Sequence, residues 1–595
     1  MRSAAEVTFR ARQEAANLFL LASQPRFSGE VPLSLALPDV HALAEALRGS
    51  EYAHGIETVA QEILAHRFPL LGLTIDTGPE IHWRRDYVHG KDSDRAYFRR
   101  IPYLDFQTVG DHKIVWELNR HQHLVLLAQA FRFTSRDEYK REIFAQFESW
   151  FEQNPFQRGI NWASALEVAF RALSWIWIYH LIGTEMPDAF RRRFLTELYR
   201  HAWHLAENLS VYFSPNTHLL GEAVALYALA TLFPQFPRSA VWRQRSAEIV
   251  RAQLRFQVQP DGAHFEQSTY YHIYALDLFL LFYVLAGHPE DFRPTLERMA
   301  EYLQWILGLA RRISFVGDDD GGRAFHPYGQ RDQFGRATLT TCGILLGKHE
   351  WIGASREIAE QAAWWVGAES FRFSPGPVAP PRGSRLFENS GAAFLQSGDL
   401  FLQMDCGPFG WAGAGHSHSD TLSILLWLGS EPVLIDPGTY TYLGNPAERQ
   451  WFRGSSAHNT VRVDGLDQGR AAGPFRWASK PKVTLEAWRP DESGGAVQAS
   501  CEYEGLKHRR RVQLTVGKLL VTDEIEGPPG DHVVEQIWQL GPAASKVRFT
   551  FSAPAAEVVS RFSPAYGVQR PGCSRIARIE GPLPVRLTMQ LEPIE

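Results

Sequence analysis

The chain has 595 residues, and its 61 lysine and arginine residues against 66 aspartate and glutamate residues give a formal net charge of −5. Hydrophobic residues make up 45% and charged residues 21% of the chain, which excludes a disordered or fibrous protein. The sequence has no lysine- and arginine-rich run that would pair with a nucleic-acid backbone or an anionic membrane surface. An acidic ligand would therefore have to be bound by a local basic cleft.

The N-terminal stretch MRSAAEVTFRARQEAANLFLLAS lacks the features of an export signal, because acidic residues interrupt it and no apolar stretch leads to a cleavage site. No apolar run reaches the ~18 residues of a membrane span. We therefore expect no membrane partner and a cytoplasmic location, or a periplasmic or secreted one if an export signal has been removed. The cysteines are far apart and show neither metal-site nor disulfide spacing; they are Cys342, Cys406, Cys501 and Cys573.

Helical patterns dominate the first two thirds of the chain. Residues 1–80 indicate helix in TFRARQEAANLFLLAS and HALAEALRGSEYAHGIETVAQEILAHRF, followed by an irregular segment rich in aromatic residues and arginine. Further on, segments such as SALEVAFRALSWIWIYHLI and THLLGEAVALYALATLF repeat apolar residues with the period of an α-helix. Short breaks separate about ten such helices, which predicts stacked antiparallel hairpins over residues 81–373.

The pattern changes after residue 373. Residues 374–385, SPGPVAPPRGSR, contain proline and glycine that would break a helix, so we predict an extended domain linker. Segments such as ENSGAAFLQSGDLFLQMDC and HRRRVQLTVGKLLVTDEIEG then alternate with the period of a β-strand. Residues 386–595 are therefore predicted to form an antiparallel β-sandwich.

Two polar clusters interrupt the helical pattern. In SPNTHLLGEA, Asn216 occupies a helix start, and His218 and Glu222 lie one turn apart on one face. A capping asparagine and a surface pair would explain this cluster without any function. In DGAHFEQSTYYHIYALD, Gln267 and Tyr271 belong to a crowd of polar and aromatic residues at the opening of another helix, which is harder to explain by packing alone.

Two further clusters lie in the strand-rich half. GHSHSD contains His416 and His418, and Asp436 in LIDPGTY ends an apolar run that indicates a buried strand. A buried carboxylate is costly unless it binds a cation or accepts several hydrogen bonds. RGSSAHNT adds Arg453 and His458 before another strand. Two histidines and an aspartate from different strands would make a zinc site, but no short regular spacing links them.

In this order, the segments SPNTHLLGEA, DGAHFEQSTYYH, GDDDGGR, GHSHSDTLS, LIDPGTYTY and WFRGSSAHNT resemble the heparinase II/III-like family of polysaccharide lyases. Upstream, VWELNRHQHL and GINWASALEVAFRALSW resemble the helical domain of the same family. The resemblance covers roughly residues 80–595. It implies an incomplete (α/α) toroid followed by an antiparallel β-sandwich, in agreement with the change in hydrophobic period.

The resemblance also implies roles for individual residues. Such lyases remove the proton at C5 of a uronic acid and expel the sugar oxygen at C4. Tyr271 matches the family's tyrosine acid, His416 its histidine on the sandwich side, and Asn216 the residue that binds the substrate carboxyl group. Because some members have Asn and His adjacent whereas this chain has Asn-Thr-His, His218 is an alternative for that place. The implied metal ligands are His418, Asp436 and His458.

The predicted chemistry requires a neutralised carboxylate, because the C5 proton is otherwise scarcely acidic. Asn216, with His218 or Gln267, can donate hydrogen bonds to that group. Either Tyr271 or His416 can be the base. If H5 and the C4 oxygen lie on one side of the ring, as in glucuronate, Tyr271 can act as base and then acid; if they lie on opposite sides, as in iduronate, His416 takes the proton.

Further residues are candidates for substrate contact. Arginine suits carboxylate and sulfate groups, and tryptophan stacks on sugar rings. Besides Glu222 and Gln267, these candidates are Arg120, Arg323, His326, Arg453, Trp116, Trp162 and Trp411.

The sequence thus predicts a lyase that cleaves glycosaminoglycans (heparin, heparan sulfate, chondroitin sulfate or hyaluronan) by β-elimination. Its partner would be an acidic polysaccharide, and its cofactor one structural divalent metal ion, zinc, with no organic cofactor. One alternative is an alginate or bacterial exopolysaccharide lyase of the same fold. Another is a non-catalytic polysaccharide-binding or biosynthetic accessory protein. A hydrolase is disfavoured because no pair of carboxylates is marked by the sequence.

Overall fold

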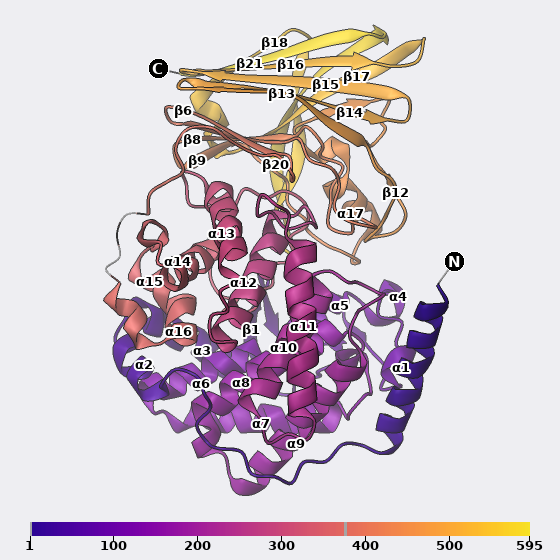
Figure 1. Ribbon diagram of the computed structural model, residues 1–595. Helices are drawn as coiled ribbons and strands as arrows, with labels where there is room; N and C mark the ends of the chain where they lie inside the picture. The colour runs from indigo at the N-terminus through magenta and orange to yellow at the C-terminus, as the bar shows by residue number, and fades with distance from the viewer. Residues whose placement is uncertain (1–2, 374–375, 377, 595) are drawn as a thin grey trace.

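The structure has two domains, a lower helical domain and an upper domain of β-strands (Figure 1). The computed structural model describes residues 3–373, 376 and 378–594, so positions 374, 375 and 377 of the predicted linker lie outside the described residues. The last helical turn before the linker ends at Arg372, and the first strand after it begins at Arg385. The predicted fold, a helical toroid followed by an antiparallel sandwich, is confirmed.

The helical domain alternates inner and outer helices along the chain. Helices α6, α8, α10, α12 and α14 are buried almost throughout, whereas α7, α9, α11 and α13 bury only one side. A helix that is apolar all round belongs inside a domain, and an amphipathic one covers it, so this alternation produces a ring of helical hairpins. Their bounds are α6 Gln122–Thr134, α7 Asp137–Gln153, α8 Ala165–Ile182, α9 Asp188–Glu207, α10 Thr217–Leu232, α11 Ser239–Gln257, α12 Thr269–Leu285, α13 Arg293–Leu307 and α14 Phe334–Leu346.

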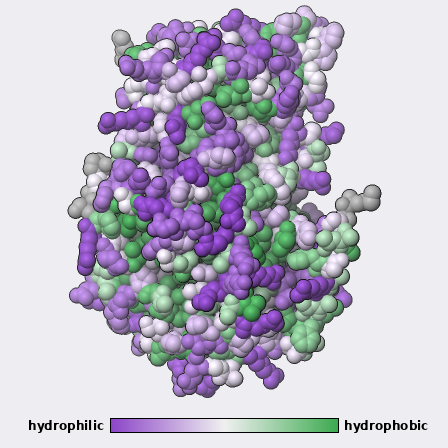
Figure 2. All heavy atoms as spheres, viewed as in Figure 1, coloured by the Kyte–Doolittle hydropathy of each residue, from purple (hydrophilic) through white to green (hydrophobic). Residues whose placement is uncertain are grey.

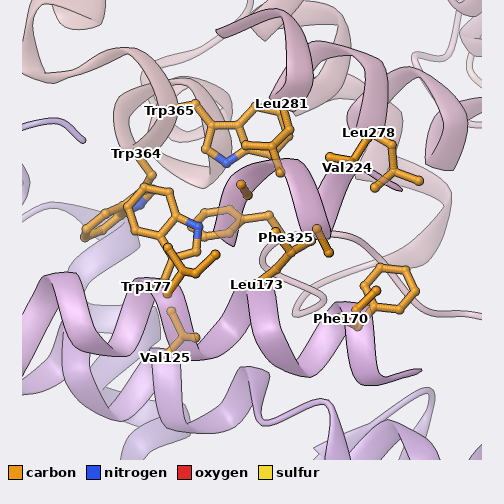
Figure 3. Packing of buried hydrophobic residues seen from close by; sticks show 14 of the residues in the cluster. Val125, Phe170, Leu173, Trp177, Val224, Leu278, Leu281, Phe325, Trp364 and Trp365 are labelled. Atoms are coloured by element: carbon orange, nitrogen blue, oxygen red, sulfur yellow. The ribbon is translucent and has the colours of Figure 1, made fainter. Parts of the chain in front are cut away.

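Further elements complete this domain. They are α1 Ala4–Ala22, α2 Val40–Leu47, α3 Glu51–Leu64, α4 Phe106–Val109, α5 His112–Asn119, α15 Ser355–Glu357 and α16 Ala363–Val366, with two small hairpins β1 Arg67–Leu70, β2 Leu73–Asp76, β3 Arg85–Asp86 and β4 Lys91–Asp92. The aromatic side chains Trp177, Phe325, Trp364 and Trp365 pack together in the core of this domain (Figure 3).

Helix α8 is apolar and lies buried in the core of the helical domain. Among the described residues, only the segment Ala165–Glu185 is long and apolar enough to span a membrane by length and composition, and its apolar window is entirely buried within the protein. It is a core helix, packed between α6 and α10.

The visible outer surface is mostly polar, with apolar residues scattered among polar ones (Figure 2).

The upper domain is a sandwich of two antiparallel sheets. In the described part of the chain, one sheet has the order β19-β20-β17-β9-β8-β7-β6-β5, with β10 also paired to β17, and the other β13-β14-β15-β16-β21-β18. The strands are β5 Arg385–Phe387, β6 Ala392–Ser397, β7 Leu400–Asp405, β8 Ile424–Leu428, β9 Glu431–Leu434, β10 Val461–Val463, β13 Lys482–Asp491, β14 Gly494–Tyr503, β15 Leu506–Thr515, β16 Lys518–Glu526, β17 Asp531–Leu540, β18 Val547–Phe551, β19 Ala555–Ala565, β20 Val568–Pro582 and β21 Val585–Pro593. The small pair β11 Arg470–Ala471 and β12 Trp477–Ser479 and the helix α17 Pro446–Arg453 lie beside them.

The side chains of β6 join the two domains, because successive residues of a strand point to opposite faces. Ala393 and Leu395 belong to the sandwich core, whereas Phe394 belongs to the core of the helical domain. There its ring packs on Trp305 of α13, with 5.5 Å between ring centroids. The domains therefore share a buried apolar contact that fixes the seam between them.

Candidate active site

A cleft of about 810 Å³ lies where the two domains meet. The helical domain lines it with the first turns of α10 and α12, and the sandwich domain lines it with loops around residues 411–416 and 472–476. All four predicted catalytic residues line this cleft: Asn216, His218, Tyr271 and His416.

Helix capping places two of these residues at the cleft. Asn216 is the N-cap of α10, where its side-chain oxygen accepts a hydrogen bond from the His218 amide at 3.1 Å, as predicted. Ser268 is the N-cap of α12 and accepts from the amide of Tyr271 at 3.2 Å, which holds Tyr271 in the first turn. Both helix N-termini, with their partial positive charge, therefore face the cleft.

Tyr271 and His416 meet across the seam. Their rings are stacked, with 3.7 Å between centroids and 19° between ring planes. The Tyr271 hydroxyl also lies 3.2 Å from the hydroxyl of Tyr442, which belongs to the sandwich domain. A sugar ring cannot lie between two rings in contact, so both side chains approach a substrate from the same wall of the cleft.

Asp318, in the loop before α14, connects both histidines of GHSHSD. His416 Nδ1 lies 3.2 Å from Asp318 Oδ2, and His418 Nε2 lies 2.9 Å from Oδ1. The guanidinium of Arg449 donates to both carboxylate oxygens. Gly317 allows this approach, because its φ is +71° and a Cβ there would lie 2.6 Å from the His416 carbonyl oxygen.

These contacts set the charge of each group. Burial alone would raise the pKa of Asp318, but Arg449 and the two imidazoles hold it well below its usual range. Burial alone would lower the pKa of His416, but Asp318 and Glu266 raise it above its ordinary value. Burial and the nearby Asp320 carboxylate raise the pKa of Tyr271 well above its usual value. Tyr271 is therefore a neutral phenol at neutral pH.

Glu266 and Asn216 form the adjoining wall. Asn216 Nδ2 donates to Glu266 Oε1 at 2.5 Å, and Thr217 donates to the other oxygen. The Asn216 amide nitrogen carries a second hydrogen, which is available for a ligand. His218 stands beside it, and burial together with nearby His416 lowers the pKa of His218 to about 4, so this imidazole is neutral.

A possible metal-binding cluster lies behind His416. His418, Asp420, Asp436 and His458 each offer a ligand atom, and these atoms lie within 4.8 Å of one another. The donor set of two imidazoles and two carboxylates suits zinc. His418 Nδ1 and His458 Nε2 are buried without a hydrogen-bond partner, which fits a role of both atoms as metal ligands. The structure adds Asp420 to the three predicted ligands.

His416 and His418 thus differ although they are two residues apart. They lie in a loop rather than in a regular strand, and both contact one carboxylate. His416 turns its other nitrogen toward the cleft, where Nε2 lies 3.6 Å from Glu266. His418 holds Asp318 through Nε2 and has Nδ1 free for the cluster.

Three of the other candidates line the cleft. Trp411 is 45% exposed at the rim and stacks on Phe265, with 5.5 Å between ring centroids. Trp116 is buried and donates to a backbone carbonyl. Arg120 is also buried, and its guanidinium is committed to Glu167 through two hydrogen bonds of 2.7 and 2.9 Å.

The remaining substrate-binding candidates do not line the cleft. Trp162 and Arg323 are buried in the helical core, and His326 lies in a small separate pocket. Gln267 donates to a backbone carbonyl of the sandwich domain, and Arg453 is stacked on Trp477. Glu222 accepts hydrogen bonds from the amide and hydroxyl of Ser210, both at 2.6 Å, and burial raises its pKa to about 8. Of these side chains, Gln267, Arg453 and Glu222 support the loops around the site.

Sequence reasoning missed Asp318, Glu266, Asp420 and Tyr442 as site residues. All four lie inside segments that carried the family resemblance: GDDDGGR, DGAHFEQSTYYH, GHSHSD and LIDPGTYTY. Their positions in those segments were the available signal. What was lacking was the pairing between segments, since 98 residues separate Asp318 from His416.

Comparison with known proteins is consistent with this architecture. Residues 44–305 match the family described as heparinase II/III N-terminus, and residues 379–572 match heparinase II/III-like, C-terminal. A heparin-sulfate lyase of Bacteroides stercoris is 23% identical over 75% of this chain and 65% of its own length. A heparin-sulfate lyase of Pedobacter heparinus is 24% identical over 60% of this chain and 53% of its own length. The chain therefore spans less than two thirds of these relatives.

Solved structures share the fold. A crystal structure of heparinase III aligns with a TM-score of 0.68 at 18% identity, covering 98% of this chain and 90% of that one. The chondroitin AC lyase of Streptomyces coelicolor A3 aligns with a TM-score of 0.54 at 12% identity, covering 98% and 83%. Both neighbours thus share the overall fold of this chain.

Proposed function

Because the chain belongs to the heparinase II/III-like family, we propose that it is a polysaccharide lyase that cleaves uronic-acid-containing glycosaminoglycans by β-elimination. The observation that carries the proposal is the contact between the Tyr271 and His416 rings across the domain seam, beside the amide of Asn216. A protein that only binds polysaccharide has no need for a phenol and an imidazole in contact. The similar proteins are named heparin-sulfate lyases, which also supports the proposal.

The first task of the site is to neutralise the uronate carboxylate. The free hydrogen of the Asn216 amide and the neutral imidazole of His218 are hydrogen-bond donors at the cleft surface. The N-termini of α10 and α12 add a favourable field. Charge that develops on the carboxylate as the C5 proton leaves is then met by donors already in place.

The second task is proton transfer. The neutral Tyr271 phenol suits the acid, which gives its proton to the departing C4 oxygen. His416 suits the base, because Asp318 accepts from Nδ1 and the neutral imidazole then turns the lone pair of Nε2 toward the cleft, where Glu266 lies 3.6 Å away. The C5–H and C4–O bonds break, a C4–C5 double bond forms, and the reverse transfers through solvent reset both residues.

The stacked rings favour a particular stereochemistry. Both groups act from one wall of the cleft, so H5 and the C4 oxygen must lie on the same side of the sugar ring. This is the arrangement in glucuronate. Glucuronate-containing polymers are therefore the expected substrates, and iduronate, which needs groups on opposite faces, is disfavoured.

The direct test is incubation with heparin, heparan sulfate, chondroitin sulfate, hyaluronan and alginate. Elimination leaves a conjugated unsaturated uronate that absorbs in the ultraviolet, whereas hydrolysis leaves none. We expect absorbance to rise with at least one glucuronate polymer. New reducing ends without that absorbance would show a hydrolase and refute the proposal.

One observation favours a second candidate, a lyase for weakly sulfated or unsulfated polymers such as bacterial exopolysaccharides. Sulfate recognition needs free arginine or lysine side chains. Among the described arginine and lysine residues that line the cleft, only Arg476 lacks an ion pair. Arg99 pairs with Glu14, and Lys113 pairs with Glu117 and Asp320. Faster cleavage of hyaluronan than of heparin in the same panel would support this candidate.

The metal cluster has a structural part in the proposed function. Zinc held by His418, Asp420, Asp436 and His458 would supply charge that stabilises the loop behind His416. His418 would then be fixed from both sides, by the ion and by Asp318. The proton-transfer residues themselves lie outside this donor set.

Replacing His458 with alanine is expected to remove the bound metal and lower the melting temperature by roughly 5–10 °C, since a bound ion adds a few kcal/mol to folding. Elemental analysis and thermal unfolding with and without a chelator provide the measurement. The chelator should lower the melting temperature of the wild-type protein by a similar amount, and it should leave the melting temperature of His458→Ala unchanged.

The matched control is His532→Ala, which removes another histidine–aspartate pair of the sandwich domain, outside the cluster. This variant should keep its metal and its response to the chelator. Wild-type protein that contains no metal and ignores the chelator would refute the metal site.

A further inference from the structure

The N-terminal helix α1 is part of the cleft wall. It stands at the edge of the helical domain, with its N-terminal end toward the seam (Figure 1). Both ranges that match the family lie beyond it, since the first begins at residue 44. Yet Phe9 and Gln13 of α1 line the same cleft as Tyr271 and His416.

Buried amides hold α1 in this place. Asn17 of α1 is fully buried, and Asn17 and Asn208 exchange two hydrogen bonds of 2.8 Å. Gln157 donates to Asn17 at 2.7 Å, and Arg99 pairs with Glu14 of α1 at 2.9 Å. These buried hydrogen bonds and the ion pair hold α1 against the segment that follows Asn208.

That segment, residues 209–216, links α1 to the reacting centre. It carries Tyr212 and Phe213, and it ends at Asn216. Buried Glu222 anchors its start by accepting both hydrogen bonds from Ser210. The ring of Phe9 packs edge-on against Tyr212, with 5.2 Å between centroids, and Phe213 is 60% exposed.

We propose that Phe9, Tyr212 and Phe213, named here the outer platform, bind a second sugar ring of the polysaccharide, next to the reacting uronate. This inference rests on the proposed function, because its ligand is the same polymer. Flat aromatic rings suit the apolar faces of sugars, and exposed aromatic surface is otherwise costly. A cleft of about 810 Å³ also has room beyond a single ring. Gln13 at its edge offers polar contacts to hydroxyl groups.

The experiment compares Phe9→Ala with Phe19→Ala. Phe19 lies on the same helix, is 68% exposed and does not line the cleft, so it is a matched control. With a long polymer, Phe9→Ala should raise KM by about three- to tenfold, the loss expected for one ring contact, with little change in kcat. With the shortest oligosaccharide that wild type cleaves, KM should not change. Phe9→Tyr, which keeps the ring, should behave as wild type.

A structural role of Phe9 would not produce this dependence on substrate length. Because Phe9→Ala removes packing from α1, Phe213→Ala provides a second variant, which deletes an exposed ring without opening a core. It should raise KM for the long polymer in the same way. Equal KM values for Phe9→Ala, Phe213→Ala and Phe19→Ala would overturn the outer platform.

Failure of the proposed function would be seen separately, as wild-type protein that cleaves none of the polymers. Affinity electrophoresis in gels containing heparan sulfate, hyaluronan or alginate then tests the platform without turnover. Weaker retardation of Phe9→Ala than of Phe19→Ala in one of these gels would support it. Equal retardation in all of them would overturn it.

Discussion

Tyr271→Phe is expected to lower kcat by about 10²–10⁴-fold, the usual contribution of a positioned acid or base, and to leave polysaccharide binding intact. The substitution deletes one oxygen atom and keeps the ring that stacks on His416. It breaks only the 3.2 Å contact with the Tyr442 hydroxyl. The measurement is the rise in ultraviolet absorbance on a cleaved polymer, together with affinity electrophoresis.

Tyr270→Phe is the matched control for this prediction. Tyr270 precedes Tyr271 on α12, but its hydroxyl donates to the Gly322 carbonyl at 2.7 Å and does not line the cleft. Its loss should cost about 1 kcal/mol of stability and leave kcat near the wild-type value. Full activity of Tyr271→Phe, or equal losses in the two variants, would contradict the proposed acid.

Asp318→Asn is expected to affect stability and catalysis together. The change leaves the buried guanidinium of Arg449 without its carboxylate, and breaking a buried ion pair in this way costs about 3–5 kcal/mol. It also takes the charged acceptor from His416 Nδ1, which should lower kcat by about 10²–10⁴-fold because the imidazole loses its fixed tautomer and orientation. Chemical denaturation and kcat per folded molecule measure the two effects.

The control variant Asp319→Asn separates the effect on stability from the effect on kcat. Asp319 is the next residue, is equally buried, and pairs with Arg331 at 2.6 Å, but it contacts neither histidine of the site. This variant should lose a similar amount of stability and retain its kcat per folded molecule. If Asp318→Asn keeps kcat as well, Asp318 holds the domains together without positioning the base.

The sequence by itself determined the order of the domains and the chemistry-bearing segments. The change of hydrophobic period near residue 374 follows from burial on one side of a helix or strand, which is a local property. Asn216 could be placed at a helix start because capping depends on neighbouring residues only. The family resemblance of the motifs around Tyr271 and His416 singled out both residues, although they belong to different domains.

The tertiary structure alone decided which side chains meet. Trp162 and Arg323 resembled sugar and anion contacts, but the packing of inner helices against outer ones buries both in the core. Asp318 acquired its importance from partners 98, 100 and 131 residues away. Helix α1 joined the cleft through a buried amide pair that spans 191 residues. Periodicity and capping report the environment within a few turns of chain, whereas these contacts exist only once the two domains have closed on each other.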